Sequence, residues 1–303
     1  MKLKVLISGG TGLVGQAITE LLDKKGYEVA VLSRRKNVEG IKSFYWDYEK
    51  DEIDSEAIEF ADVIIHLVGE NISSKKWTFE QKKRIITSRV QTTKLLESSI
   101  KKSKKKPKAF LSASAIGYYG SKTTNQIFEE DDNHGDDFLA ETVVKWEESV
   151  QLIQKLDIPT AAIRIGVVMS QKGGALSKML MPVKFGVGSA LGNGKQWVPW
   201  VSLEDLARMF VFVMEEKLLK NPSEKFEVYN ATAPNHINNS QLMKQLAKAI
   251  NRPYFMPSVP AFIFKLLLGE MSMILLEGSR VSSEKIQNEG FQFEDTEIKD
   301  VFR

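Results

Sequence analysis

The segment SASAIGYYG, residues 112–120, places two adjacent tyrosines four and five residues after a serine. A serine hydroxyl can orient a substrate oxygen, and a tyrosine phenol can exchange its proton with that oxygen. Ser114, Tyr118 and Tyr119 are therefore the candidate catalytic residues. Because a free phenol ionises near pH 10, a tyrosine that works near neutrality needs a neighbouring cation, for which Arg89 and Lys195 are candidates. The alternative interpretation is a strand end followed by a turn.

A second informative segment is GGTGLVG, residues 9–15, which follows the apolar run 3–8 and opens a helical pattern. Glycines in this spacing between a strand and a helix are typical of a dinucleotide site, with the pyrophosphate at the helix N-terminus. Gly9 would permit the tight turn and Gly12 would let the backbone approach the pyrophosphate. Gly15 would let the helix pack close to the sheet.

The next predicted strand ends in Ser33, Arg34 and Arg35. Sites that prefer NAD carry an acidic residue here, which bonds the ribose hydroxyls. A guanidinium instead pairs with a 2′-phosphate, so the sequence favours NADP(H) as the cofactor over NAD. Two arginines on a solvated loop are the alternative. Asp47, which ends the third predicted strand, could accept a hydrogen bond from the adenine amino group or could be a turn residue.

Apolar runs alternate with helical patterns in the first part of the chain. Strands are predicted over 3–8, 28–33, 42–47, 61–68, 108–114 and 160–169, and helices over 13–25, 80–100, 138–156 and 203–218. Continuous apolar strands that alternate with helices indicate an α/β fold with a doubly wound parallel sheet. We expect a nucleotide-binding domain over residues 1–172, to which 203–232 returns, and a smaller C-terminal substrate-binding lobe within 173–303.

Composition excludes several classes of site. The 303 residues include no cysteine, so disulfides and thiolate chemistry are excluded, and the three histidines lie far apart, so no metal site is expected. A net charge of +3 is too small to indicate nucleic acid, and the basic run 101–108 fits a solvated helix end.

The apolar segment that begins at Val259 is too short to span a bilayer, because Lys265, Gly269 and Glu270 interrupt it. It is expected to be a buried or partner-facing helical element, and the protein is expected to be cytoplasmic with no membrane partner.

Taken together, the motifs resemble the extended short-chain dehydrogenase/reductase superfamily, whose fold is the NAD(P)-binding Rossmann fold. Within it the chain is similar to the epimerase-family oxidoreductases sometimes labelled cell-division-inhibitor-like or sugar-epimerase-like. The motifs are HLVGENISSKKWT (66–78), TSRV (87–90), SASAIGYYG (112–120), FLAETVVKWE (138–147), RIGVVMSQKGGAL (164–176), GNGKQWVPWVSLEDL (192–206), NATAPN (230–235) and GFQF (290–293). They span essentially the whole chain.

The resemblance implies roles for particular residues. Those expected to line the pyrophosphate are Thr11, Gly12, Leu13 and Val14, and those expected to wall the adenosine side are Leu67, Val68, Gly69 and Glu70. Ile165 and Gly166 would lie near the nicotinamide, and Arg89 would point to the cofactor or the substrate unless it forms a surface salt bridge. Trp77, Lys195, Gln196 and Trp197 would face a small-molecule substrate, and a homodimer is one option because members often dimerise.

One motif of the superfamily is missing. Its members normally carry a tyrosine and a lysine four residues apart at the start of the helix that here begins at Phe138, but this chain pairs Phe138 with Thr142 and Leu139 with Val143. Two functions therefore remain open. The first is an NADP-dependent oxidoreductase or epimerase that moves hydride at a carbinol or carbonyl carbon. The second is a non-catalytic NADP(H)-binding redox sensor or regulatory protein.

Overall fold

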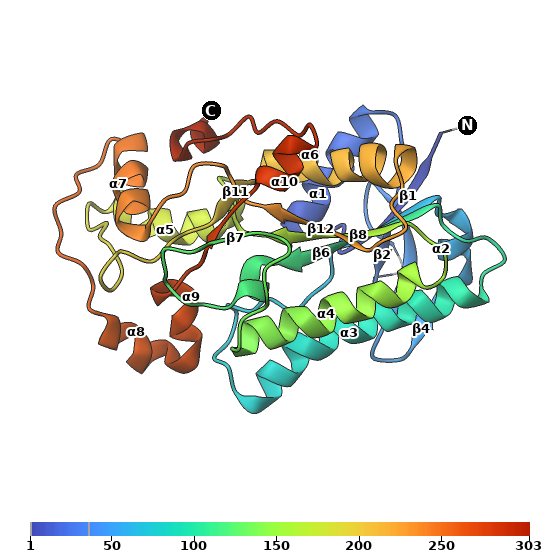
Figure 1. Cartoon of the computed structure of the whole chain (residues 1–303), viewed down its shortest axis with the longest axis horizontal. Helices are drawn as coiled ribbons and strands as arrows, with labels where there is room; N and C mark the ends of the chain where they lie inside the picture. Colours follow the sequence, from blue (N-terminus) through green and yellow to red (C-terminus); the bar gives the residue numbers. More distant parts are fainter. Residues whose placement is uncertain (1, 36) are drawn as a thin grey trace.

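The computed structural model describes residues 2–35 and 37–303, and its centre is an eight-stranded sheet (Figure 1). Its strands lie in the order β12 (Glu227–Ala231), β8 (Thr160–Ile165), β6 (Ala109–Ala115), β5 (Val63–His66), β1 (Lys4–Ser8), β2 (Glu28–Ser33), β3 (Lys42–Asp47) and β4 (Glu52–Ile53). All neighbouring strands are parallel except β3 and β4. The predicted doubly wound parallel sheet is confirmed.

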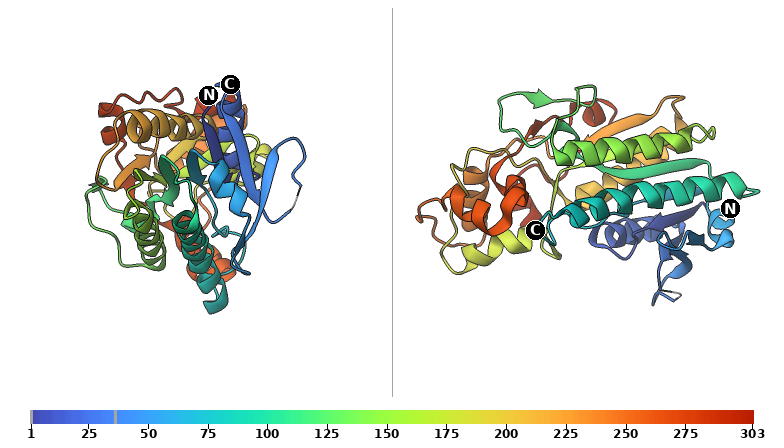
Figure 2. Two further views of the ribbon diagram at one scale, coloured as in Figure 1. Left: turned by 90° about the vertical axis from the view of Figure 1, so that its right-hand side faces the viewer. Right: turned by 90° about the horizontal axis from the view of Figure 1, so that it is seen from below.

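Helices cover both faces of this sheet, as Figures 1 and 2 show. Helices α3 (Phe79–Lys102) and α4 (Phe138–Gln154) pack together on one face, and α1 (Leu13–Lys24) packs with α6 (Leu203–Phe212) on the other. The short α2 (Ser55–Phe60) leads into β5. Because β1 is paired with β2 on one side and β5 on the other, the strand order reverses at β1 and leaves a crevice at the carboxyl ends.

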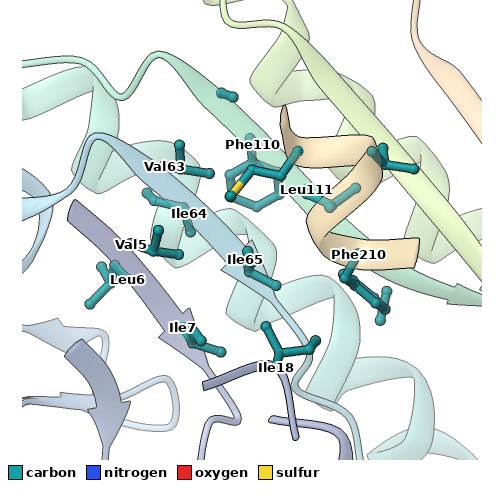
Figure 3. Close-up of a cluster of buried hydrophobic side chains, with 14 of the residues drawn as sticks. Val5, Leu6, Ile7, Ile18, Val63, Ile64, Ile65, Phe110, Leu111 and Phe210 are labelled. Carbon is teal, nitrogen blue, oxygen red and sulfur yellow. The ribbon is translucent and has the colours of Figure 1, made fainter. Parts of the chain in front are cut away.

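The main core lies between the sheet and these helices (Figure 3). Its strands are buried on both faces, which is why they are continuous apolar runs in the sequence. Fully buried side chains drawn in Figure 3 include Val5, Leu6, Ile7, Ile64, Ile65, Phe110, Leu111 and Phe210.

The remaining elements build a smaller lobe around a second core that includes Met169, Trp200, Leu242 and Leu246. They are β9 (Val167–Ser170), β10 (Gly173–Gly174), α5 (Ala175–Lys184), β11 (Trp200–Ser202), α7 (Asn239–Ala249), α8 (Ala261–Leu268), η3 (Gly269–Ser272), α9 (Met273–Leu276) and η4 (Ile298–Phe302). A two-stranded sheet of β7 (Ile127–Phe128) and β13 (Arg280–Val281), α10 (Glu284–Asn288) and the π-helix η2 (Val213–Lys220) complete the chain. No helix in the described part of the chain is long and apolar enough to cross a bilayer.

One predicted strand was wrong, and one predicted helix changes its type along its length. The strand predicted over 160–169 divides at Gly166, because β8 stays in the main sheet while β9 pairs with β10 and β11. At the division, Gly166 donates to the carbonyl of Ala231 and Val167 donates to that of Pro199. The helix predicted over 203–218 is α-helical only to Phe212 and continues as the π-helix η2.

Candidate functional site

The turn between β1 and α1 has the geometry that the glycine pattern predicts. Gly9 has a φ of +75°, which L side chains rarely adopt, and its carbonyl accepts from the Gly12 amide at 3.0 Å. Gly12 is the N-cap residue of α1 and supplies no side-chain cap, and the first turn of α1 contains no acidic residue. The first amides of α1 are therefore available to an anion, and Thr11, Leu13 and Val14 surround them without being buried.

Gly15 holds this turn against the helix. A Cβ atom at this position would lie 2.4 Å from the Gly9 carbonyl oxygen and 2.5 Å from the Gly10 Cα atom. The close approach that the pattern predicts is therefore between the helix and the turn itself. A Cβ atom at Gly12 would lie 3.3 Å from the Gly9 oxygen, so Gly12 is not required for packing to the same degree.

At the neighbouring strand end, Arg34 and Arg35 are exposed, and neither forms an ion pair within the described residues. The Ser33 hydroxyl accepts from the Arg35 amide at 3.0 Å and so shapes the turn. Asp47 accepts from the Glu49 amide at 3.1 Å and lies 3.6 Å from the Lys50 amine. Asp47 thus makes a turn contact, while the predicted contact to adenine stays a prediction.

Arg89 of α3 lies under the loop after β5. Its Nη1 donates to the carbonyls of Glu70 and Ile85, at 3.2 and 2.9 Å, and a Cβ atom at Gly69 would lie 2.9 Å from its guanidinium carbon. Burial lowers the pKa of Arg89 to about 10, and the charge of Glu70 opposes that shift. Among the described residues Arg89 has no carboxylate partner within salt-bridge distance, so the surface salt bridge considered for it is not seen. Leu67 and Val68 are half-buried beside the main core.

Beneath the glycine turn lies a buried histidine, His66, at the end of β5. Its Nδ1 lies 2.6 Å from the hydroxyl of Ser8, and its Nε2 lies 3.2 Å from those of Thr92 and Thr93. Both threonine hydroxyls donate to helix carbonyls, so they accept from the Nε2 proton and Nδ1 accepts from Ser8. His66 is therefore neutral, and burial lowers its pKa from 6.5 to about 3. The network ties the glycine turn to α3.

This network makes stability depend on pH. The folded-state pKa of His66 lies below its ordinary value of 6.5, so the unfolded chain binds the proton first as the pH falls. The stabilisation is fully present above pH 6.5 and is lost between pH 6.5 and about 3. We expect His66 to add a slope of at most about 1.4 kcal/mol per pH unit to the free energy of unfolding in that window. Urea denaturation at several pH values measures the slope, which His66→Asn should reduce.

The serine and one tyrosine of SASAIGYYG belong to a buried polar network (here called the Glu147–Arg164 network). The Ser114 hydroxyl donates to Glu147 Oε1 at 2.6 Å, and Arg164 of β8 pairs with both Glu147 oxygens at 2.8 and 2.9 Å. Arg164 also donates to the Tyr119 hydroxyl at 2.9 Å, and that hydroxyl donates to Asn230 at 2.8 Å. Burial is the main cause that raises the pKa of Tyr119 far above its ordinary value.

Tyr118 is placed differently. It lies in the 3-10 helix η1 (Ile116–Tyr119), is half-buried, and has no hydrogen bond from its hydroxyl within the described residues. The guanidinium carbon of Arg164 lies 3.4 Å from its ring centroid, and the rings of Tyr119 and His134 pack edge-on against it. Arg164 thus lies against the face of this phenol ring, while the roles considered for Arg89 and Lys195 stay predictions.

The start of α4, where the superfamily normally carries its tyrosine and lysine, packs against η1. A Cβ atom at Gly117 would lie 3.3 Å from the Leu139 Cβ atom and 3.7 Å from a Val143 methyl group. The aliphatic side chains of Leu139 and Val143 therefore face η1 at the start of α4. Lys145, further along α4, forms an exposed ion pair with Glu141.

Two of the residues expected near the substrate, Trp77 and Gln196, are buried and form hydrogen bonds within the protein. Ile165 is the last residue of β8, at the carboxyl edge of the sheet, and Gly166 follows it. Trp77 is buried and donates to the Ile72 carbonyl at 2.8 Å. Lys195 is exposed, and buried Gln196 donates to the carbonyls of Leu191 and Leu275.

The Trp197 side chain is half-buried. Its indole nitrogen donates to the Thr124 carbonyl at 2.9 Å, and the Arg280 guanidinium carbon lies 4.9 Å from its ring centroid. His236 accepts at Nδ1 from Arg280 at 2.9 Å and donates from Nε2 to the Val281 carbonyl at 2.9 Å. The predicted substrate contacts of Trp77, Lys195, Gln196 and Trp197 stay predictions.

Glu147, Arg164 and Asn230 are site residues that sequence reasoning missed. The sequence does mark Arg164, because it is the one charged residue in the apolar run TAAIRIG, residues 160–166. A buried charge needs a partner, so a carboxylate on a facing helix could have been sought. Glu147, in the helix that packs on this strand, would then have been the candidate.

Two family models match the chain, and relatives of known sequence align with nearly all of it. Residues 5–231 match the NAD dependent epimerase/dehydratase family, and residues 259–303 match a domain of unknown function, DUF1731. The epimerase family protein YfhF of Bacillus subtilis is 33% identical over 293 residues, which cover 96% of this chain and 94% of that protein. The mouse epimerase family protein SDR39U1 is 32% identical, with 98% and 97% coverage.

Solved structures agree with these matches. The crystal structure of human epimerase family protein SDR39U1 (isoform 2) with NADPH has a TM-score of 0.87 and 30% identity, and covers 99% of this chain and 97% of its own. The nucleoside-diphosphate sugar epimerase of Corynebacterium glutamicum has a TM-score of 0.78 and 28% identity, and this chain covers 57% of its length. A UDP-glucose 4-epimerase from Thermus thermophilus, at 18% identity, shares the fold.

Proposed function

The chain belongs to the NAD dependent epimerase/dehydratase family, and from this membership we propose that it is an NADP(H)-dependent oxidoreductase or epimerase acting on a small molecule. The observation that carries the proposal is the pairing of two features at adjacent strand ends. One is the uncapped N-terminus of α1 under the glycine turn, and the other is the pair Arg34 and Arg35. Human SDR39U1, solved with NADPH, supports the choice of cofactor.

The two arginines should set the preference for NADPH over NADH. Because each is exposed and has no carboxylate partner among the described residues, each can pair with a 2′-phosphate that only NADPH carries. We expect Arg34→Ser/Arg35→Ser to weaken NADPH binding about 10- to 100-fold, the value of one or two hydrogen bonds between charged groups, and to leave NADH binding nearly unchanged. Isothermal titration with both cofactors measures this. An equal loss for both cofactors would contradict it.

Bound NADPH would supply the hydride, and the chain's own residues must orient the substrate and exchange the proton. Ser114 and Tyr119 are both committed to the Glu147–Arg164 network, so we propose that they position the site. Tyr118 has a hydroxyl without a partner among the described residues, and the face of its ring lies against the Arg164 guanidinium. We propose Tyr118 as the residue that exchanges the proton.

Tyr118→Phe tests this role. We expect the variant to bind NADPH like the unaltered protein but to oxidise it at least about 100-fold more slowly with whichever carbonyl compound a panel identifies, since that is the usual contribution of a positioned acid. Tyr119→Phe is the matched control, and it should lower stability without removing turnover as completely. Unchanged turnover in the Tyr118 variant would contradict the assignment.

A second function, NADP(H)-linked sensing or regulation without turnover, is favoured by one observation. Leu139 and Val143 face η1 at the start of α4, where the superfamily normally carries its tyrosine and lysine. Under this alternative, tight NADPH binding would be accompanied by no oxidation with any compound in the panel. A cytoplasmic location and a homodimer stay predictions.

A further inference from the structure

One end of the molecule carries an unusual set of exposed apolar side chains. Six large ones are more than half exposed: Met181, Phe185, Phe255, Phe262, Leu266 and Leu267, at 57–80%. They lie at the end of α5, in the loop before α8, and on α8 itself, which has no buried residue. Elsewhere among the described residues only Phe79 is as exposed in this class.

These segments form one surface, here called the apolar face. Val259 donates to the Ala190 carbonyl at 2.9 Å, and its own carbonyl accepts from Gly192 at 2.8 Å. A Cβ atom at Gly186 would lie 3.9 Å from the Pro253 ring. The chain after α5 therefore lies beside the chain that leads into α8, and Figures 1 and 2 show both at the end of the molecule away from β1. Six large apolar side chains exposed on neighbouring segments mark a candidate interaction surface.

The segments that form the apolar face carry only cations, and the first carboxylate after α8, that of Glu270, is paired with Lys82. The sequence contains no aspartate or glutamate from Ile158 to Leu203 or from Val228 to Gly269. Lys184, Arg252 and Lys265 lie within these segments, are exposed, and form no ion pair in the part of the chain that the structure describes. In contrast, lysines of the basic run 101–108 are used internally, since Lys105 and Lys108 pair with Asp62.

We propose that the apolar face binds the surface of a membrane that contains anionic lipids, with α8 lying in the headgroup region. Phe262, Leu266 and Leu267 would enter the acyl boundary while Lys184, Arg252 and Lys265 contact the headgroups. α8 has eight residues, so it lies on the bilayer without spanning it. A second copy of the chain fits less well, because a two-fold contact would oppose these cations to one another. This differs from the expectation of no membrane partner, since only the structure shows α8 to be exposed.

Sedimentation of the whole protein with vesicles tests the proposal. We expect strong binding to vesicles of phosphatidylcholine mixed with phosphatidylglycerol, weak binding to phosphatidylcholine alone, and loss of the difference at high salt. Lys184→Gln/Arg252→Gln/Lys265→Gln should weaken binding to the mixed vesicles by roughly 100-fold, about fivefold for each cation. The matched control is Lys94→Gln/Lys102→Gln/Lys104→Gln, in the C-terminal half of α3 and directly after it. This variant makes the same change in net charge and should leave binding within about twofold.

A second variant tests the apolar contribution. Phe262→Ser/Leu266→Ser alters only exposed side chains, so its melting temperature should match that of the unaltered protein, and its binding to the mixed vesicles should fall at least about tenfold. Absence of binding to anionic vesicles would overturn the proposal, as would an equal loss in the control variant. A dimer in solution that becomes monomeric in Phe262→Ser/Leu266→Ser would overturn it in favour of an interface between copies.

Discussion

Gly12→Ala is expected to remove NADPH binding while the protein stays folded. The φ of Gly12 is −81°, which alanine adopts freely, and the added Cβ atom would meet only the Gly9 oxygen at 3.3 Å. The same Cβ atom would occupy the space that a pyrophosphate needs to reach the amides of α1. Loss of two hydrogen bonds to a charged group corresponds to at least about a 100-fold weaker complex. Isothermal titration and a thermal melt measure the two effects.

Gly15→Ala is the contrasting variant. Its Cβ atom would lie 2.4 and 2.5 Å from backbone atoms of Gly9 and Gly10, and backbone cannot yield as a flexible side chain can. We expect a loss of roughly 1–3 kcal/mol in the free energy of unfolding together with weakened NADPH binding. If Gly12→Ala destabilised the protein as much as Gly15→Ala does, the separate roles assigned to the two glycines would be wrong.

Glu147→Gln is expected to cause the largest loss of stability. Glu147 and Arg164 are 5% and 3% exposed and are joined by two hydrogen bonds, so neutralising the carboxylate leaves a buried guanidinium without its counter-charge. Breaking a buried ion pair by altering one partner typically costs about 3–5 kcal/mol. The Ser114 and Tyr119 hydroxyls depend on the same pair, so both should lose their orientation. Urea denaturation measures the free energy of unfolding.

A double-mutant cycle separates the ion pair from general disruption of the core. Glu147→Leu/Arg164→Met removes both charges, and we expect it to be less destabilised than the sum of the two single variants by at least about 1 kcal/mol. Strict additivity would show that the two side chains do not act as a pair. Replacement of the exposed Lys145, two residues before Glu147, should change stability by less than about 0.5 kcal/mol.

The agreement between sequence and structure is greatest where the signal is local. Continuous apolar strands, the glycine turn after β1 and the start of α4 at Phe138 all follow from residues within one element, because backbone propensity and burial act over short stretches. The doubly wound parallel sheet also follows, because continuous apolar strands that alternate with helices indicate it.

The roles of the chemically active side chains follow from contacts between distant segments. The hydrogen-bond partners of Ser114 and Tyr119 lie 33 and 111 residues further along the chain, so no periodicity near 112–120 could show that their hydroxyls are already engaged. The division of the predicted strand 160–169 likewise depends on the contact of Val167 with Pro199. The apolar run after Val259 could have been a buried helix, and its exposure depends on which surfaces the rest of the fold leaves uncovered. Composition and sequence pattern thus determine the helices, the strands and the glycine turn typical of a dinucleotide site. The packing of distant segments determines that, within the described part of the chain, the Tyr119 hydroxyl is engaged and the Tyr118 hydroxyl is not.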